Sequence, residues 1–524
     1  MKKVITFIRE NILREKVFFG IFNILVLFMF AVLLHYGLEM TGIDNFRNYW
    51  DEHIYLAKES VIKNIVVLLI SVLLTYFVGK LSVFMKNRRV RGIVLMVSCV
   101  LMSAGSIFWV CGLHSVPVGD QKIVFDFASV FNNGEYYGLE RGQYIAIYPQ
   151  QLGLVTLLRP FVKLVGDNNY FAFQLMVALL VWLIPFAGTM IVRMISQDNP
   201  RVELFYQVFV LTCFPIYGYT AFVYGDLIAL PFVMLGIWGY LSCMKKFRVW
   251  KLVCLALTMG LAVTLKTNML IVMVAMILVA IIQFIVGNGK KNLWIAAATG
   301  MGVLLFSLSV KAIYAPHYED GAEGIPASSW IAMGFSDNEQ GPGWYNIYAL
   351  DMFYRADYDA GLANEIAKQD IRDRLAAYLA NPEYMVDFFS RKMNTQWNAP
   401  MYQSVVMVNQ QIVKEQNKVI HEICYRGTLG KMIEKYMKAY QLLMYAGIFF
   451  LMISGWNREN HLEDYVLLVA VFGGFLFTMI WEAKTRYAFP YLVMMIPYMA
   501  MGVNRMSEVP ERWKKRHKKE VAPE

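Results

Sequence analysis

Long apolar runs separated by short polar turns dominate the pattern of hydrophobic and polar positions along the chain. About twelve of these runs approach the roughly 20 residues that a helix needs to cross a bilayer. The pattern therefore predicts an all-α polytopic membrane protein. We expect the spans at 17–38, 61–84, 92–113, 169–194, 203–222, 225–243, 250–266, 268–287, 292–313, 437–455, 463–481 and 487–504.

Basic residues mark one side of these runs and so predict the orientation. If both termini are cytoplasmic, all of these residues fall on the cytoplasmic side, as the positive-inside rule requires. The external regions are then 39–60, 114–168, 219–226, 264–268, 314–436 and 482–487. The basic residues are Lys2, Lys3, Arg9, Arg14, Lys16, Lys86, Arg88, Arg89, Arg91, Arg193, Arg201, Lys245, Lys246, Arg248, Lys290, Lys291, Lys514, Lys515, Arg516, Lys518 and Lys519.

Composition agrees with a protein of the plasma membrane. The chain is 58% hydrophobic and 17% charged, whereas soluble proteins carry about 25% charged residues. Its formal net charge of +10 arises from the basic turns, so it indicates topology and no nucleic-acid partner. All cysteines except Cys424 lie in apolar runs, which excludes a disulfide framework and a Cys-x-x-Cys metal site.

The order of apolar and polar segments predicts five regions. A two-span extension (1–91) precedes a membrane core (92–313), in which the candidate chemistry described below begins. An external loop with a small helical cap (314–436) follows, then the spans that complete the core (437–504) and a basic cytoplasmic tail (505–524).

Three segments outside the predicted spans also have helical character, but they are too polar or too interrupted to be read as spans. In the cap, 360–379 and 383–393 have helical periodicity, and Pro382 suits a first helical turn. Segment 148–165 is apolar but is interrupted by Arg159, Pro160 and Lys163, so we expect an interfacial helix there.

Asp120 is the strongest candidate for chemistry. It stands where the chain leaves the third span and enters the first external loop of the core. A carboxylate at that depth can act as a general base, because ionisable groups near the membrane are commonly functional. Capping of a helix is the alternative role for Asp120. Asp126, on the same stretch, is a weaker candidate and is equally explained as a solvated acid.

Two external cations violate the positive-inside pattern and so suggest a bound anion. Arg486 follows Glu482 before the last span, and its planar fork can clamp phosphate oxygens. Lys266 separates two spans with almost no loop, where snorkelling is the alternative. Asp226 opens a span at an external turn, where it could orient a partner or simply complete the turn.

Aromatic residues complete the candidate substrate site. Tyr148 and Gln150 open the interfacial helix at headgroup level, where a belt tyrosine is the simpler alternative. Trp330, Trp344 and Trp397 are expected to be exposed and suited to stacking on sugar rings, although packing of the loop explains them equally well. The seven histidines show no ligand spacing, so no metal site is predicted.

These motifs together resemble the GT-C class of integral membrane glycosyltransferases, which use polyprenyl-phosphate-linked sugars. The likeness covers most of the chain from about residue 92 onward and rests on Gly119-Asp120-Gln121, Tyr148-Pro149, Tyr224-Gly225-Asp226 and EAKTRYAFP at 482–490. The resemblance implies that Asp120 is the catalytic carboxylate and that Arg486 lies near the donor phosphate.

A looser resemblance narrows the acceptor. Segments 328–334 and 343–351 are similar to cell-wall glycopolymer glycosyltransferases of Gram-positive bacteria, which include those acting on teichoic acid. Two features depart from the class pattern: two extra spans precede the core, and Gln121 stands where some families have a second acid. The second departure leaves a divalent cation at Asp120 as an open alternative.

The predicted function is inverting transfer of a sugar from a polyprenyl-phosphate donor to a cell-envelope glycan or glycopolymer at the outer face of the membrane. Asp120 would be the base, and Arg486 with Lys266 would bind the donor phosphate. Asp226 and Glu482 would orient the cations or the acceptor, and no cofactor is required. A flippase or transporter of lipid-linked glycans and a glycan polymerase or ligase are the alternatives.

Overall fold

The computed structural model describes residues 2–45, 52–455 and 461–520, and the side chains of 14–45, 52–455 and 461–509. Its α-helices are α1 (Lys2–Glu39), α2 (Val61–Lys80), α3 (Arg88–Leu113), α4 (Asp120–Asn132), α5 (Tyr144–Ile147), α6 (Leu152–Val165), α7 (Tyr170–Leu180), α8 (Leu183–Ile195), α9 (Pro200–Thr212), α10 (Phe214–Gly218), α11 (Gly225–Lys245), α12 (Val249–Leu265), α13 (Leu270–Ile285), α14 (Lys291–Tyr314), α15 (Ala327–Gly334), α16 (Tyr348–Arg355), α17 (Ala360–Ala380), α18 (Pro382–Trp397), α19 (Lys418–Cys424), α20 (Thr428–Gly455), α21 (Val466–Ile480) and α22 (Phe489–Glu520). The strands are β1 (Met40–Asp44), β2 (Ile54–Lys58), β3 (Ser115–Val116) and β4 (Gln411–Ile412).

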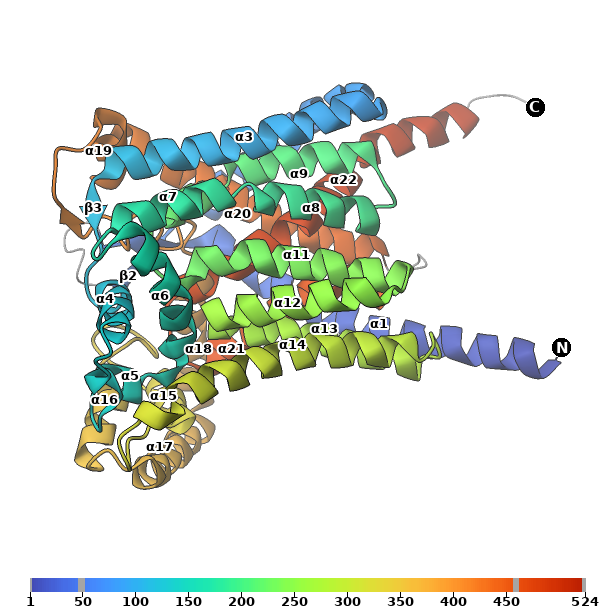
Figure 1. Cartoon of the computed structure of the whole chain (residues 1–524). Coiled ribbons are helices and arrows are strands. Elements are labelled where there is room, and N and C mark those ends of the chain that lie inside the picture. Colours follow the sequence, from blue (N-terminus) through green and yellow to red (C-terminus); the bar gives the residue numbers. More distant parts are fainter. Residues whose placement is uncertain (1, 46–51, 456–460, 521–524) are drawn as a thin grey trace.

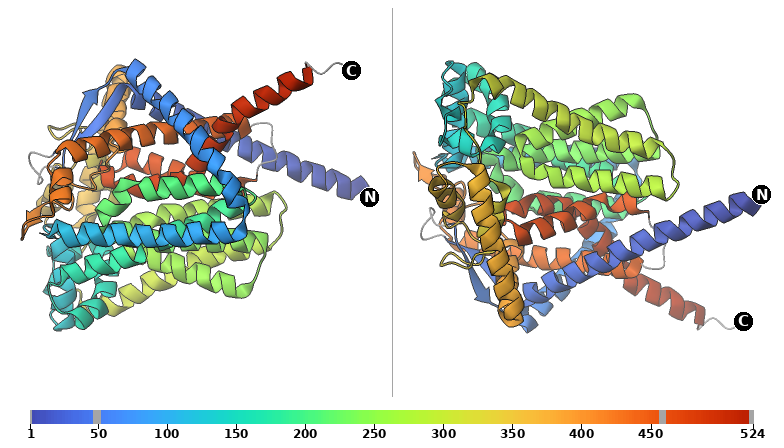
Figure 2. Two further views of the ribbon diagram at one scale, coloured as in Figure 1. Left: turned by 90° about the horizontal axis from the view of Figure 1, so that it is seen from above. Right: turned by 90° about the horizontal axis from the view of Figure 1, so that it is seen from below.

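The long helices run side by side in one bundle whose two ends differ. Figure 1 shows α1 beginning and α22 ending at the same end, which we call the terminal end. The short helices α4, α5, α15 and α16 gather at the opposite end, together with the longer helix α17. Figure 2 shows the start of α1 and the end of α22 projecting from the terminal end in two further views. Both termini therefore lie on one side, as the basic turns predict.

The spans follow the apolar runs closely. Within the described ranges, nine helices are long and apolar enough to cross a membrane. A tenth span forms if the bent pair 200–212 and 214–221, which meets at 49°, is counted as one. The apolar helix α12 is shorter, with 17 residues, and α22 continues well beyond its predicted apolar stretch. The predicted fold class, an all-α polytopic membrane protein, is confirmed, while the count of twelve spans stays a prediction.

The ambiguous segment after residue 148 forms the 14-residue helix α6. A helix of that length rises about 21 Å, which is shorter than a bilayer core. Figure 1 shows α6 among the short helices, across the direction of the long ones. The structure thus has a short helix beside the bundle end here, with Pro160 accommodated inside it.

The predicted external loop 39–60 contains a β-hairpin that the sequence pattern did not indicate. Strands β1 and β2 pair antiparallel, with Met40 opposite Lys58 and Asp44 opposite Ile54. The hairpin packs on α18, and α1 packs along α20. Region 1–91 is therefore built into the same unit as the C-terminal spans.

The polar insert forms helices where periodicity predicted them. Helix α17 covers 360–380, and α18 starts with Pro382 in its first turn, capped by the Asn381 side chain. Strand β4 of the insert pairs with β3, directly before the Asp120 loop. The insert is thereby joined to the end of the bundle that carries the candidate base.

Candidate functional site

A cavity of about 840 Å³ lies at the end of the bundle that carries the short helices. Its walls come from the β1–β2 hairpin, the Asp120 loop, the α5–α6 region, the α12–α13 turn, the insert and the segment before α22. Eight of the ten residues that we expected at a substrate site line it: Asp120, Tyr148, Gln150, Lys266, Trp330, Trp344, Glu482 and Arg486. Residues distant in sequence thus meet in one chamber.

Asp120 is presented to the cavity by the start of α4. Gly119 is the N-cap, with φ 55° and ψ −136°, a conformation that favours glycine. The alternative role of Asp120 as the cap is thus wrong: Asp120 occupies the first turn, where the helix dipole favours a carboxylate. Its side chain is exposed, and the Tyr144 hydroxyl donates to its Oδ1 over 3.0 Å.

Gln121, next to the candidate base, is a structural tether. Its Nε2 donates to the Met407 carbonyl over 3.2 Å, and its Oε1 accepts from the Val223 amide over 3.0 Å. Only 5% of the residue is exposed. Its side chain therefore fixes the Asp120 loop between two other loops.

Two tyrosines line the wall beside Asp120. Burial, with nearby Tyr224 and Asp120, raises the pKa of Tyr144, and burial likewise raises the pKa of Tyr148. Both hydroxyls therefore stay protonated and can donate hydrogen bonds at neutral pH. Tyr148 therefore lies in the cavity wall, as expected of a residue at a substrate site.

Lys266 reaches the cavity already paired. Its Nζ lies 2.9 Å from Asp226 Oδ2 and 4.5 Å from the centre of the Tyr224 ring. Asp226 is only 1% exposed and does not line the cavity. Of the two roles predicted for Asp226, contact with a substrate does not agree with this position, because the span that it opens holds it behind Lys266. The other role, orienting a cation, does agree with it. Asp226 acts on the cavity by neutralising and orienting that lysine.

Lys484, which we did not include in the predicted site, forms a second paired cation. Its Nζ lies 2.7 Å from Glu52 Oε2 and 3.6 Å from Glu482 Oε1. Burial raises the pKa of Glu52, but Lys484 and Arg486 outweigh it and hold that pKa below its usual range. Burial dominates at Glu482, whose pKa is raised. Glu52 is thus the more firmly ionised of the two acids.

Arg486 differs from both lysines. It lies in the short 3-10 turn Thr485–Tyr487 and is 6% exposed. Among the described residues, no ion pair includes Arg486, and its Nε has no hydrogen-bond partner. Its guanidinium packs 5.7 Å from the ring centre of Tyr224 and 5.6 Å from that of Tyr487. A buried guanidinium in this state is suited to an anion that enters the cavity.

The insert is fastened to the segment that carries the cations. The Ala483 amide donates to the Gly343 carbonyl over 2.7 Å, next to a parallel bridge between Trp344 and Ala483. Behind it, the buried Lys392 ammonium donates to the carbonyls of Gly334, Met479 and Trp481. One lysine thereby holds the insert helices α15 and α18 to the end of α21.

The three tryptophans have different environments. Trp330 lines the cavity and stacks on Trp481, with ring centres 6.3 Å apart. Trp344 also lines it, although only 2% of the residue is exposed. The expectation for Trp397 is wrong: it is fully buried, its Nε1 donates to Thr478 Oγ1 over 2.9 Å, and it stacks on Tyr491. The last turns of α18 enter the bundle, which its polar sequence did not reveal.

The sequence analysis missed several cavity residues. Tyr224, Lys484 and Tyr487 lie in the motifs at 224–226 and 482–490 but were given no role in the site. Charge could have pointed to Lys484, a further cation on the predicted external side. The others depend on contacts between distant segments. The missed residues are Glu52, His53, Tyr144, Gln151, Tyr224, Trp481, Lys484 and Tyr487.

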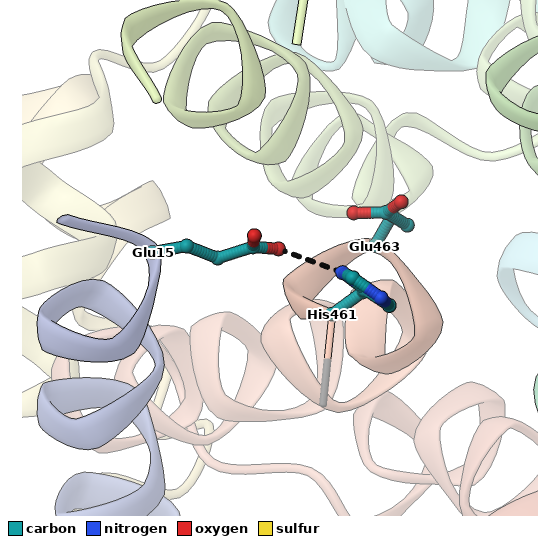
Figure 3. A group of neighbouring side chains, drawn as sticks. All are labelled: Glu15, His461 and Glu463. Atoms are coloured by element: carbon teal, nitrogen blue, oxygen red, sulfur yellow. Dashed lines mark hydrogen bonds and ion pairs between the residues drawn. The ribbon is translucent and has the colours of Figure 1, made fainter. Parts of the chain in front are cut away.

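A group of side chains with metal-ligand chemistry lies away from the cavity. Figure 3 shows Glu15 of α1 directed at His461, with Glu463 beside it, and a distance of 3.0 Å joins Glu15 Oε1 to His461 Nδ1. Within the described residues, these three side chains are the group whose ligand atoms lie close enough together to share a metal ion. Because Glu15 lies near the start of α1, the group belongs to the terminal end.

A family model matches residues 12–506, nearly the whole chain. The chain belongs to this family, described as "Conserved hypothetical integral membrane protein". The match agrees with the bundle of apolar helices, and the chain is therefore an integral membrane protein.

Among solved structures, the chain is similar to ArnT from Cupriavidus metallidurans, crystallised with undecaprenyl phosphate. The two are 13% identical, the alignment covers 78% of this chain and 77% of that one, and the TM-score is 0.33. No curated protein matches the sequence.

Proposed function

We propose that this protein is a glycosyltransferase that moves a sugar from a polyprenyl-phosphate donor to a hydroxyl group of a cell-envelope glycan, with inversion at the anomeric carbon. The observation that carries the proposal is the meeting of Asp120 and Arg486 in one cavity. Such a transfer requires a general base and a cation that can bind the leaving phosphate. Here the two groups come from segments that are distant in the sequence.

In this scheme Asp120 accepts the proton of the acceptor hydroxyl as its oxygen attacks the anomeric carbon. The new carbon–oxygen bond forms while the bond from that carbon to the phosphate oxygen breaks, and the electron pair leaves with the polyprenyl phosphate. Tyr144 orients the carboxylate through its 3.0 Å hydrogen bond. The chemistry needs no redox partner.

The charges of the cavity suit a phosphate monoester as leaving group. A sugar–phosphate–prenyl diester carries one negative charge, and Arg486 is the cavity cation that has no carboxylate partner among the described residues. Lys266, held by Asp226, adds a second contact. Charge that develops on the phosphate as the bond breaks is stabilised by these fixed groups, typically by a few kcal/mol each.

The cavity is proposed to face the cell exterior. Basic residues gather in the turns at the terminal end, so the positive-inside rule places that end in the cytoplasm and the cavity at the outer face. Nucleotide sugars are cytosolic, so a lipid-linked sugar is the donor class that fits an external site.

The test is transfer by the purified full-length protein in liposomes, with decaprenyl-phosphate hexoses as donors and envelope glycan fragments as acceptors. We expect Asp120→Asn to lower the rate about 10²–10⁴-fold, the usual contribution of a general base. Asp126→Asn is the matched control. Asp126 lies on the same helix but pairs with Lys122 and accepts from the Tyr170 hydroxyl over 2.9 Å, outside the cavity lining.

Normal turnover by Asp120→Asn would remove the base from the mechanism. Movement of the donor across the liposome bilayer without any transfer would instead identify a flippase and overturn the proposal.

A further inference from the structure

The β1–β2 hairpin delivers an acidic side chain to the cavity from outside the predicted core. The Gly42 amide donates to the Asn398 carbonyl over 2.8 Å, and Gln403 Nε2 donates to the Glu52 carbonyl over 2.7 Å. A Cβ at Gly42 would lie 2.8 Å from that of Ala399, so the hairpin is seated closely on the loop after α18. The position of Glu52 is therefore fixed by the fold.

The Glu52 carboxylate is anchored on one side and accessible on the other. Its Oε2 is held by Lys484 at 2.7 Å, yet 28% of the side chain remains exposed where it lines the cavity. Lys484 is shared with Glu482, so two carboxylates surround one ammonium. Because the Lys484 ammonium is already paired with carboxylates, this group is less suited to phosphate than Arg486 is. It is suited to hydroxyl groups, which donate to carboxylates in charge-assisted hydrogen bonds.

Aromatic faces stand beside this carboxylate. The Lys484 ammonium lies 5.5 Å from the centre of the Tyr345 ring, and Trp344 and Tyr345 both line the cavity. A pyranose ring has an apolar C–H face and a rim of hydroxyl groups. It therefore fits an aromatic wall that stands next to a hydrogen-bond acceptor such as the Glu52 carboxylate. The cavity thus divides into a phosphate side at Arg486 and a hydroxyl-binding side at Glu52.

We propose that Glu52, held by Lys484, binds hydroxyl groups of the sugar on the donor lipid and so selects the sugar that is transferred. This deepens the proposed function and rests on it. The donor sugar is assigned here because it is attached to the phosphate, and because Lys484, which holds Glu52, lies two residues before Arg486 and lines the same cavity. The N-terminal hairpin is then part of the specificity site.

The experiment measures binding of decaprenyl phosphate, bare or carrying β-linked glucose, galactose or mannose, to the detergent-purified full chain. Glu52→Gln keeps the size of the side chain and an oxygen for Lys484 but removes the negative charge. The matched control is Glu59→Gln, because Glu59 pairs with Lys63 at 3.2 Å beyond the hairpin and does not line the cavity. A melting curve of each variant confirms that it is folded.

We expect the wild type and Glu59→Gln to bind at least one glycosylated lipid more tightly than the bare lipid. Glu52→Gln should lose about tenfold to a hundredfold in affinity for that lipid, the usual strength of hydrogen bonds to a charged group. Its affinity for bare decaprenyl phosphate, which depends on Arg486, should not fall, because the substitution removes a negative charge beside the cavity cations.

Equal affinities of Glu52→Gln and the wild type for the glycosylated lipid would overturn the assignment of Glu52. So would a wild type that binds bare and glycosylated lipids equally, although phosphate binding and the proposed function would then stand. A wild type that binds neither lipid would remove the proposed function and the Glu52 assignment with it.

Discussion

Two buried arginines, one at each end of the bundle, show how differently the same side chain can be used. Arg91, at the terminal end, donates to Asp198 over 3.0 Å and to Glu203 over 2.7 Å, and Arg193 binds Glu203 as well. Arg486, at the cavity end, has no ion pair within the described part of the chain and keeps an unpartnered Nε. Burial of a charge is therefore common to both ends. The absence of an ion-pair partner, among the described residues, is what distinguishes Arg486.

The difference follows from the cost of a buried charge. Glu203 is fully buried and shared by two arginines, so that cluster is complete without any ligand. The Arg486 guanidinium lies among aromatic rings without an ion pair. Part of the free energy needed to remove its charge from water is therefore not compensated until an anion binds. The terminal cluster thus stabilises the fold, whereas Arg486 is available to a substrate.

The largest expected effect separates the two arginines directly. Arg486→Met should lower kcat/KM for the lipid donor about 10²–10³-fold with little change in melting temperature, because Glu52 and Glu482 keep their ion pairs with Lys484. Arg91→Met should destabilise the protein by about 3–5 kcal/mol, because Glu203 and Asp198 lose a partner, and should leave the KM for the donor unchanged. Donor kinetics and melting curves of both variants give the comparison. The opposite assignment of effects would contradict it.

A smaller effect is expected at the paired cation of the cavity. Lys266→Met should reduce donor use about tenfold, since its charge is already partly neutralised by Asp226. It should also lower the melting temperature, because Asp226 is 1% exposed and loses its ion pair.

Adding Asp226→Asn to Lys266→Met separates these two consequences. The double variant should regain the melting temperature without regaining donor use. Recovery of both would show that Lys266 acts only through the fold.

The smallest expected effect concerns the buried carboxyl group of Asp44 in the β1–β2 hairpin, near the cavity end of the bundle. Burial, with nearby Glu434, raises the pKa of Asp44 to about 7, and neither carboxyl oxygen has a hydrogen-bond partner. Because the folded protein binds this proton more tightly than the unfolded chain, the associated stability is complete below pH 3.8 and is lost as pH rises through about 7.

Asp44→Asn removes this titration, and melting curves between pH 5 and 8.5 measure it. The melting temperature of the variant relative to the wild type should rise from pH 5 to about 7 and then level off, by a few degrees in total. A difference that does not change with pH would contradict the assignment.

The membrane architecture was largely predictable because its signals are local. Runs of apolar residues and the side chosen by lysine and arginine can be counted along the chain. The same counting exposed Lys266 and Arg486, since each breaks the orientation rule where it stands. Asp120 was detectable from its place at the exit of a span.

The rest of the site depends on contacts that no local pattern encodes. Glu52 enters the cavity only because β1 and β2 pair and the hairpin packs on the loop after α18. Trp397 does not lie at the cavity surface, because the end of α18 enters the bundle. There its indole N–H donates a hydrogen bond to Thr478. Asp226 reads as a turn acid in sequence, and only the structure places it behind Lys266.

Lys392 has a consequence for how substrates reach the cavity. Lifting the insert away from α21 and the segment after it would break the hydrogen bonds from the Lys392 ammonium to the Met479 and Trp481 carbonyls, and the one from the Ala483 amide to the Gly343 carbonyl. We therefore expect the insert to behave as a fixed wall and not as a hinged lid. Donor and acceptor would then enter and leave through an opening that is always formed, and domain motion would not limit the turnover rate.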